Sequence, residues 1–213
     1  MRFDSFISLV GLHAFFDLAT VVQLSGEKRS TLQTQLYRWI RANKLVPLKR
    51  GMYALARRYR QASVNPAQLA NHLYRPSYLS REWALGFHGL IPEKVVTHTS
   101  VTSRVPRLFQ NDFGFFEYRH VKRGAFFGYG AVEIQGHKVL LAEPEKALLD
   151  SWHLATGPWT TERMREMRFQ GHEAVDPDRL RRYAVRYDSP RLLRAVDLWC
   201  ELAGSELEGV AEL

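Results

Sequence analysis

Apolar residues recur with a helical period between residues 30 and 42. At 100° per residue, four of them fall on one face of a helix: Leu32, Leu36, Trp39 and Ile40. Ser30 precedes Gln33 by three positions, which is the spacing of a capping box. The pattern therefore predicts a helix that starts at Ser30 and buries one face.

The opposite face of this helix carries only hydroxyl, amide, phenol and guanidinium groups. It contains no Asp or Glu, whereas a helix that merely faces water usually includes acids that pair with its cations. Such groups bond base edges and phosphates, so the face predicts a DNA-reading helix; the alternative is a solvated face without a ligand. The candidate contacts are Ser30, Thr31, Gln33, Thr34, Tyr37, Arg38 and Arg41.

The flanking segments complete a helix-turn-helix pattern with a wing. A helix over residues 17–24 starts at Asp17, a favoured N-cap, and Gly26 suits the turn that follows it. Residues 45–48 and 52–55 alternate like the two strands of a hairpin. The hairpin tip and the segment behind it add four cations for phosphate contacts: Lys49, Arg50, Arg57 and Arg58.

Charge and pattern both change near Arg75, where we place a domain boundary. The fold class we expect is α+β, with a winged helix-turn-helix over residues 1–75 and a mixed domain over residues 76–213. The second domain would contain helices over 77–87 and 144–154 and a small antiparallel sheet of strands at 95–99, 113–120, 130–134 and 138–142. Three C-terminal helices would follow, beginning near residues 161, 177 and 190.

The charge is concentrated where DNA binding is predicted. The chain has 213 residues and a net charge of +8. Residues 1–75 hold 12 Lys or Arg and three Asp or Glu, whereas the rest of the chain holds 18 and 19. A basic module on a nearly neutral body favours a polyanionic partner at one end of the molecule.

Composition narrows the class of protein further. Cys200 is the single cysteine, so the chain contains no internal disulfide and no cysteine-based zinc site, which fits a reducing cytoplasm. No run approaches the roughly 20 apolar residues that a membrane-spanning helix needs. We therefore expect a cytoplasmic protein with no membrane partner.

Three stretches, "LVPLKRGMYAL", "SREWALGFHGLIPEKVVTHTS" and "VLLAEPEKALLD", resemble the AbiEi family of antitoxins and related transcriptional regulators. The resemblance covers roughly residues 15 to 155. It implies a bacterial repressor that binds double-stranded DNA at inverted repeats in its own promoter. It also implies a second domain that counters a nucleotidyltransferase-like toxin. No antitoxin residue is carried over, because the matching motifs beyond Arg75 are structural in character.

We expect no enzymatic activity and no cofactor, because the chain lacks a glycine-rich phosphate loop and a nucleophile elbow. One alternative is a metal-dependent nuclease that uses Glu133, Glu143, Glu145 and Lys146. Another is a ligand-sensing winged-helix regulator unrelated to toxin–antitoxin systems.

A third alternative concerns the second domain, where aromatic and basic residues are interleaved and single-stranded nucleic acid or a protein could bind. The aromatic residues are Phe109, Phe113, Phe115, Phe116, Phe126, Phe127 and Tyr129. The basic residues are Arg104, Arg107, Arg119, Lys122 and Arg123. The competing interpretation is an ordinary sheet core beside a basic loop. The sequence leaves the oligomeric state open.

Overall fold

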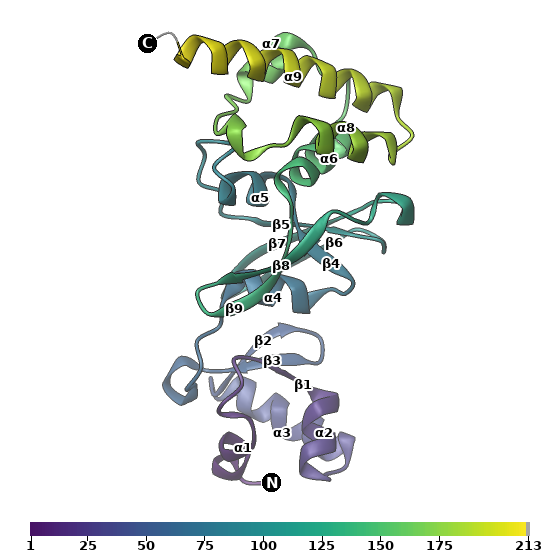
Figure 1. The fold of residues 1–213 in the computed structure, drawn as a ribbon. Coiled ribbons are helices and arrows are strands. Elements are labelled where there is room, and N and C mark those ends of the chain that lie inside the picture. Colours follow the sequence, from purple (N-terminus) through teal and green to yellow (C-terminus); the bar gives the residue numbers. More distant parts are fainter. Residues whose placement is uncertain (212–213) are drawn as a thin grey trace.

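The computed structural model describes the backbone of residues 1–211 and the side chains of residues 1–205. It is a mixed α+β structure arranged in three tiers (Figure 1). The N-terminal unit (residues 1–60) forms one end, the central layer (65–142) contains a six-stranded sheet, and the helical layer (143–211) forms the other end.

The N-terminal unit contains the predicted helix, turn, helix and hairpin. Its elements are α1 (Phe3–Val10), β1 (Phe16–Asp17), α2 (Leu18–Ser25), α3 (Arg29–Arg41), β2 (Leu45–Lys49) and β3 (Met52–Leu55). The carboxylate of Asp17 accepts the Thr20 backbone N–H at 2.7 Å and caps α2, and Gly26 ends that helix at a φ of 65°. The three strands form an antiparallel sheet in the order β1-β3-β2.

The predicted start of α3 is wrong by one residue. The helix begins at Arg29 after Lys28, whose side chain makes no capping bond. Ser30 therefore lies inside the first turn, where the backbone is helical, and the capping box with Gln33 does not form. The hydroxyl of Thr34 instead donates to the Ser30 carbonyl at 3.1 Å, within the helix.

The sheet of the central layer is larger and more mixed than predicted. The elements of this layer are α4 (Pro66–Leu73), β4 (Ser77–Leu79), α5 (Arg81–Phe87), β5 (His98–Thr102), β6 (Arg107–Asn111), β7 (Gly114–His120), β8 (Tyr129–Ile134) and β9 (His137–Ala142). The strand order is β6-β7-β5-β4-β9-β8, and the pairs β5–β7 and β4–β9 are parallel. The expectation of a small antiparallel sheet is therefore wrong. Strand β4 is only three residues long and was hidden in a helical pattern, and β6 is too exposed to show a hydrophobic alternation.

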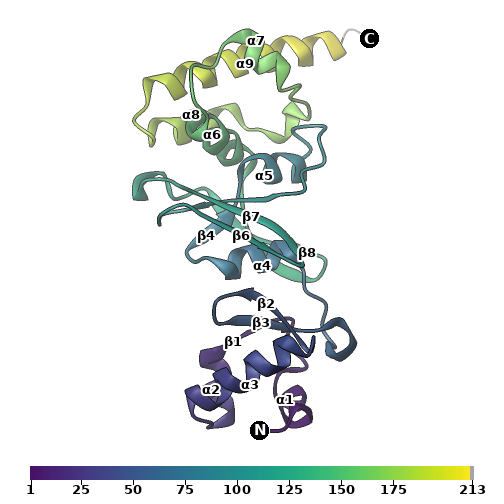
Figure 2. The same ribbon diagram turned by 180° about the vertical axis from the view of Figure 1, so that it is seen from behind.

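Helix α4 belongs with the sheet, although the sequence placed it in the first domain. It begins at Pro66, and the side chain of Asn65 caps it by accepting the backbone N–H groups of Ala67 and Gln68. The buried side-chain amide of Asn71 accepts a hydrogen bond from the backbone N–H of Leu140 at 2.6 Å and donates one to the Leu140 carbonyl at 3.2 Å. These two bonds hold α4 against β9. The change in charge at Arg75 therefore comes after the start of the central layer. Helix α4 covers one face of the sheet and α5 covers the other (Figure 2).

The helical layer closes the far side of the sheet. Its elements are α6 (Pro144–Leu154), α7 (Thr161–Glu166), α8 (Pro177–Val185) and α9 (Pro190–Ala211). The predicted starts of these helices are confirmed. Thr160 caps α7, and the carboxylate of Asp176 caps α8 by accepting the backbone N–H groups of Asp178 and Arg179.

Strand β3 contributes to two hydrophobic cores. Its side chains alternate between the faces of the small sheet. Leu55 packs with α1, α2 and α3, whereas Met52 and Ala54 pack with the central layer. Asn111 on β6 also donates from Nδ2 to the Leu48 carbonyl on β2 at 3.2 Å. The N-terminal unit is thus packed directly on the central layer.

A fully buried ion pair fastens the helical layer to the sheet. Lys146 and Asp150 lie one turn apart on α6, and the ammonium donates to the carboxylate. The carboxylate also accepts hydroxyl hydrogen bonds from Tyr78 at 3.0 Å and Ser80 at 2.7 Å. Tyr187, beyond α8, donates to the same carboxylate at 2.7 Å. Burial raises the pKa of both tyrosines, so their hydroxyls remain donors.

Replacing Asp150 should destabilise the protein strongly. Asp150→Ala leaves the ammonium of Lys146 buried without its counter-charge, and burial already lowers the pKa of that lysine. We expect the free energy of unfolding to fall by about 3–5 kcal/mol in denaturant titrations. The control is Asp197→Ala on the exposed side of α9, which should change it by less than about 0.5 kcal/mol. Equal effects of the two substitutions would contradict a stabilising role for the pair.

Candidate nucleic-acid interface

Helix α3, labelled in Figure 2, presents its predicted polar face to solvent. Leu32 and Leu36 are buried on the opposite side, and Trp39 packs its ring against Phe6 at 4.6 Å between centroids. Tyr37 is 60% exposed, which leaves its ring free to pack on a partner. All seven predicted contact residues are exposed: Ser30, Thr31, Gln33, Thr34, Tyr37, Arg38 and Arg41.

The N-terminal end of α3 carries two cations that the sequence reasoning missed. Lys28 and Arg29 are exposed there, and the first turn contains no acid. The helix dipole disfavours cations at this end by about 0.3–1 kcal/mol each at low ionic strength. The combination of dipole and cations gives a strongly positive helix end, which suits a phosphate. These two residues were missed because the helix was predicted to start at Ser30.

The wing turns one of its two predicted cations inward. Arg50 at the tip is exposed. The ammonium of Lys49 donates instead to the Leu73 carbonyl at the end of α4, at 2.6 Å. Burial lowers the pKa of Lys49, and Arg75 and Arg104 lower it further, against the opposing attraction of Asp17. Lys49 therefore faces the central layer, a direction that strand alternation alone did not indicate.

Two further predicted cations lie near the C-terminal end of α3. Arg57 and Arg58 are exposed on a short 3-10 turn that follows β3. The guanidinium of Arg58 lies 4.8 Å from the centroid of the Tyr59 ring and donates to the Asn43 carbonyl at 3.5 Å. This contact brings the segment behind the wing next to Asn43, two residues beyond the end of α3. The structure thus places Arg58 beside the polar helix.

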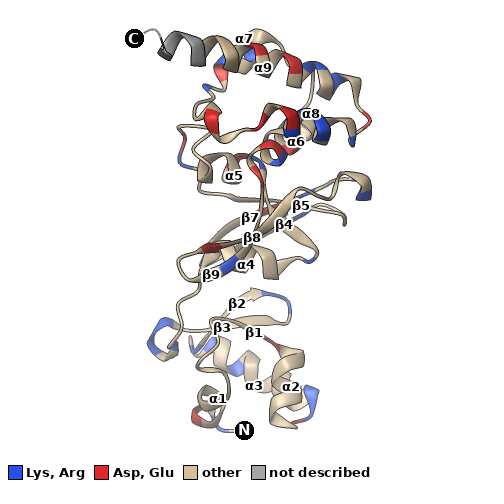
Figure 3. Ribbon diagram, viewed as in Figure 1, with Lys and Arg blue, Asp and Glu red and all other residues tan. Residues whose placement is uncertain are grey.

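The distribution of charge along the molecule agrees with the sequence. Figure 3 shows Lys and Arg on α3, on the wing and on the turn behind it, with few acids in that unit. Acids gather in α6, α8, α9 and the segments that join them. Lys and Arg accompany these acids in the helical layer, so the excess of positive charge lies in the N-terminal unit, and a polyanion would meet that unit first.

The aromatic residues of the central layer mostly serve its core. Phe116 is buried, and Phe109, Phe113 and Tyr129 are half-buried against the same cluster. Phe115 is the exception, with half of its surface exposed. The interpretation as a sheet core therefore accounts for most of the aromatic cluster, because a platform that stacks bases requires exposed ring faces.

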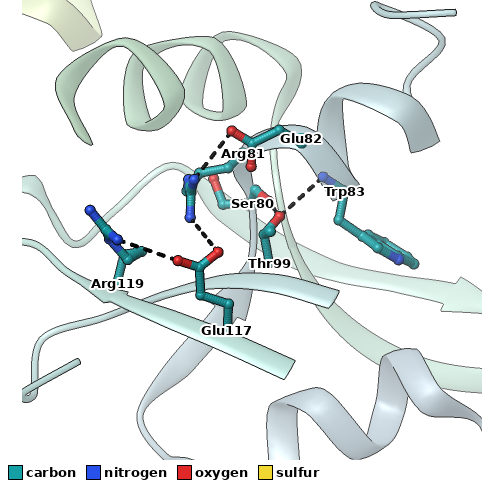
Figure 4. A network of polar contacts seen from close by, with 7 residues as sticks. All are labelled: Ser80, Arg81, Glu82, Trp83, Thr99, Glu117 and Arg119. Carbon is teal, nitrogen blue, oxygen red and sulfur yellow. Dashed lines mark hydrogen bonds and ion pairs between the residues drawn. The ribbon is translucent and has the colours of Figure 1, made fainter. Parts of the chain in front are cut away.

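A polar network at the start of α5 joins that helix to two strands (Figure 4). Arg81 has a φ of 58°, which is strained for a residue with a side chain. Its guanidinium contacts Glu117 on β7 at 3.1 Å and Glu82 at 3.3 Å. The hydroxyl of Thr99 on β5 accepts the Trp83 backbone N–H at 3.1 Å. Each charged group has an opposite charge beside it, so the network positions α5.

The acids of the nuclease alternative are engaged elsewhere. Glu145 is buried and accepts the Asp176 backbone N–H at 2.7 Å, and Glu143 accepts a tyrosine hydroxyl at 2.7 Å. Lys146 belongs to the buried ion pair, and Glu133 is exposed on β8. Among the residues that the structure describes, no group of three or more His, Cys, Asp or Glu is placed to hold a metal ion.

Comparison with protein-family models gives no match, and comparison with curated proteins gives no relative. The resemblance to AbiEi antitoxins therefore stays a prediction from the three sequence stretches. In the described part of the chain, no helix combines the length and apolar character that crossing a membrane requires.

His72 links α4 to the N-terminal unit through contacts that favour its neutral form. One Nη atom of Arg75 lies 2.7 Å from its Nδ1, and its ring lies 4.9 Å from that of Phe15. Burial lowers the pKa of His72 to about 4, and the charges of Arg75 and Lys49 add to the effect. The ordinary value is 6.5.

The pKa of His72 predicts a loss of stability in mild acid. As the pH falls from about 6.5 to about 4, His72 takes up a proton in the unfolded chain but not in the folded one. The free energy of unfolding should therefore decrease over this window. His72→Gln keeps a polar side chain without this titration and should flatten the profile relative to wild type. Identical pH profiles in denaturant titrations would show that His72 titrates normally in the folded protein.

Proposed function

We propose that the protein is a sequence-specific DNA-binding transcriptional regulator whose N-terminal unit acts as a winged helix-turn-helix. The observation that carries the proposal is the exposed, acid-free face of α3. A helix of 13 residues is roughly 20 Å long, and its diameter fits the major groove of DNA. Helix α3 would lie in that groove.

The side chains of α3 divide between bases and phosphates. Arg38 and Arg41 carry guanidiniums that suit guanine edges or phosphates, and Ser30, Thr31 and Gln33 would bond from the first turns. Thr34 already donates its hydroxyl hydrogen within the helix, so it would contribute its methyl group or accept a hydrogen bond at its hydroxyl oxygen. Tyr37 would pack on the sugar–phosphate backbone.

The phosphate contacts come from both ends of α3 and from the wing. Exposure favours Arg50, Arg57 and Arg58 over the inward-turned Lys49. Arg29 adds a cation at the N-terminal end of the helix. This arrangement gives the helix phosphate contacts along its whole length, which would fix its register in the groove.

The biological setting that we propose rests on the resemblance to AbiEi antitoxins. In that setting the protein is a cytoplasmic bacterial antitoxin that represses its own promoter and counters a nucleotidyltransferase-like toxin. The direct test is fluorescence anisotropy with DNA from upstream of its own gene against scrambled DNA, across a salt series. Tight, selective and salt-steep binding supports the proposal, and equal weak binding to both DNAs contradicts it.

Arg38→Ala should weaken specific binding by about 1–3 kcal/mol if its guanidinium bonds a guanine. Selectivity for that base pair should fall at the same time. The control is Arg194→Ala, which removes an exposed cation from α9 at the far end of the molecule. An equal loss on specific and scrambled DNA would make Arg38 a phosphate contact instead.

Removing Arg57 and Arg58 together should change the salt dependence rather than the selectivity. Each lost phosphate contact lowers the slope of log affinity against log salt by about 0.9, so the double Ala variant should lose up to about two units. Anisotropy at four or more salt concentrations measures the slope. A wild-type slope in this variant would remove the segment behind the wing from the interface.

A further inference from the structure

A pocket of about 310 Å³ lies where the wing meets the central layer. It is bordered by β2, the start of α2, the end of α4 and the segment after β5. We call it the junction pocket; its polar lining consists of Asp17, Lys49, His72, Tyr74, Arg75 and Arg104. Three of these six residues are permanent or near-permanent cations. None of the functions considered above uses the three together.

Backbone carbonyls at the end of α4 hold the three cations in place. Lys49 donates to the Leu73 carbonyl at 2.6 Å, and Arg104 donates from Nη1 to the Arg75 carbonyl at 3.0 Å. Arg75 donates from Nε to the Asn71 carbonyl at 3.4 Å. The guanidinium of Arg104 also lies 4.6 Å from the centroid of the ring of Tyr74.

These contacts use only part of the hydrogen-bonding capacity of the cations. An ammonium has three N–H donors and a guanidinium has five. Lys49 and Arg104 each donate one hydrogen bond among the described contacts, to the carbonyls of Leu73 and Arg75. Capping the end of α4 therefore explains where the cations lie. It leaves further N–H donors of these side chains available to a ligand in the junction pocket.

The positive charge in the junction pocket is not balanced by acids. Among the described side chains, no carboxylate forms an ion pair with Lys49, Arg75 or Arg104. Asp17 is the one acid in the lining, and its carboxylate caps α2 through Thr20. Three cations against one anion leave a net charge of +2, and His72 is neutral near pH 7 because its pKa is about 4.

We propose that the junction pocket binds a phosphate group, with Lys49, Arg75 and Arg104 as its ligands. A phosphate monoester carries close to two negative charges near neutral pH and has three strong acceptor oxygens, which match the net charge and the number of cations. The volume lies at the lower end of small-molecule sites, so there is room for a small group attached to the phosphate. Such a ligand would join Lys49 of the N-terminal unit to two cations of the central layer.

The first experiment titrates the full-length protein with inorganic phosphate at about pH 8 by calorimetry, at constant ionic strength set with chloride. Wild type should bind phosphate saturably, and Arg104→Met and Lys49→Met should each weaken that binding by about tenfold or more. Arg194→Met on α9 is the matched control and should bind as wild type. No saturable binding, or an equal loss in Arg194→Met, overturns the proposal.

A conservative variant separates lost binding from lost folding. Arg104→Lys keeps the charge and should bind phosphate more tightly than Arg104→Met, because the site needs a cation at that position. Thermal melting without phosphate checks that both variants fold. Wild-type phosphate affinity in a folded Arg104→Met protein would also overturn the proposal.

A second arm identifies the source of the phosphate group. If Lys49→Met and Arg104→Met lose phosphate binding but keep wild-type affinity for duplex DNA, the ligand is a free phosphorylated molecule. If they weaken both and phosphate competes with DNA, the pocket receives a phosphate of the DNA backbone. Both outcomes support the site. The phosphate titration uses no DNA, so it stands whether or not the protein is a DNA-binding regulator.

Discussion

The alternation of side chains along β3 is the constraint on which the rest of the arrangement depends. Leu55 faces the helices of the N-terminal unit, while Met52 and Ala54 face the central layer. A strand of four residues thus belongs to two cores, and a shift of register by one residue would exchange its two faces. Because both cores consist of packed, buried side chains, the small sheet fixes the direction in which α3 points relative to the large sheet.

This packing changes what the wing is able to do. A hairpin joined to the body only through a linker would present both cations at its tip to DNA. Here Lys49 reaches the Leu73 carbonyl and β2 is bonded to Asn111, so only Arg50 remains exposed at the tip. In the proposed complex with DNA, affinity for phosphates would then depend more on the ends of α3 and on Arg57 and Arg58. A group that binds at the junction pocket would act on the wing without touching α3.

Local signals in the sequence predicted the elements well. Asp17, Asn65 and Asp176 each accept backbone N–H groups of the helix that follows them. Residues of this type are favoured N-caps, so they indicate in the sequence where a helix begins. The exposed face of α3 was predicted because helical periodicity needs no knowledge of the rest of the fold. Pairing between distant strands carries no such local signal. The parallel pairing of β4 with β9 places Leu79 beside Leu141. Nothing in the sequence of either segment indicates the strand with which it pairs.

The role of the charged residues was the hardest property to predict. It depends on where each side chain points in the fold as well as on its position in the sequence. The sequence assigned the excess of the first 75 residues to one DNA-binding surface. The structure divides it: Arg38 and Arg41 point outward from α3, whereas Lys49 and Arg75 converge with Arg104 beside the end of α4. Cations at a helix C-terminus are favourable singly, but three in one pocket repel one another. Burial is the main cause of the lowered pKa of Lys49, and the charges of Arg75 and Arg104 lower it further. Binding of an anion would offset this repulsion. A ligand therefore explains the cluster of Lys49, Arg75 and Arg104 better than the capping of α4 alone.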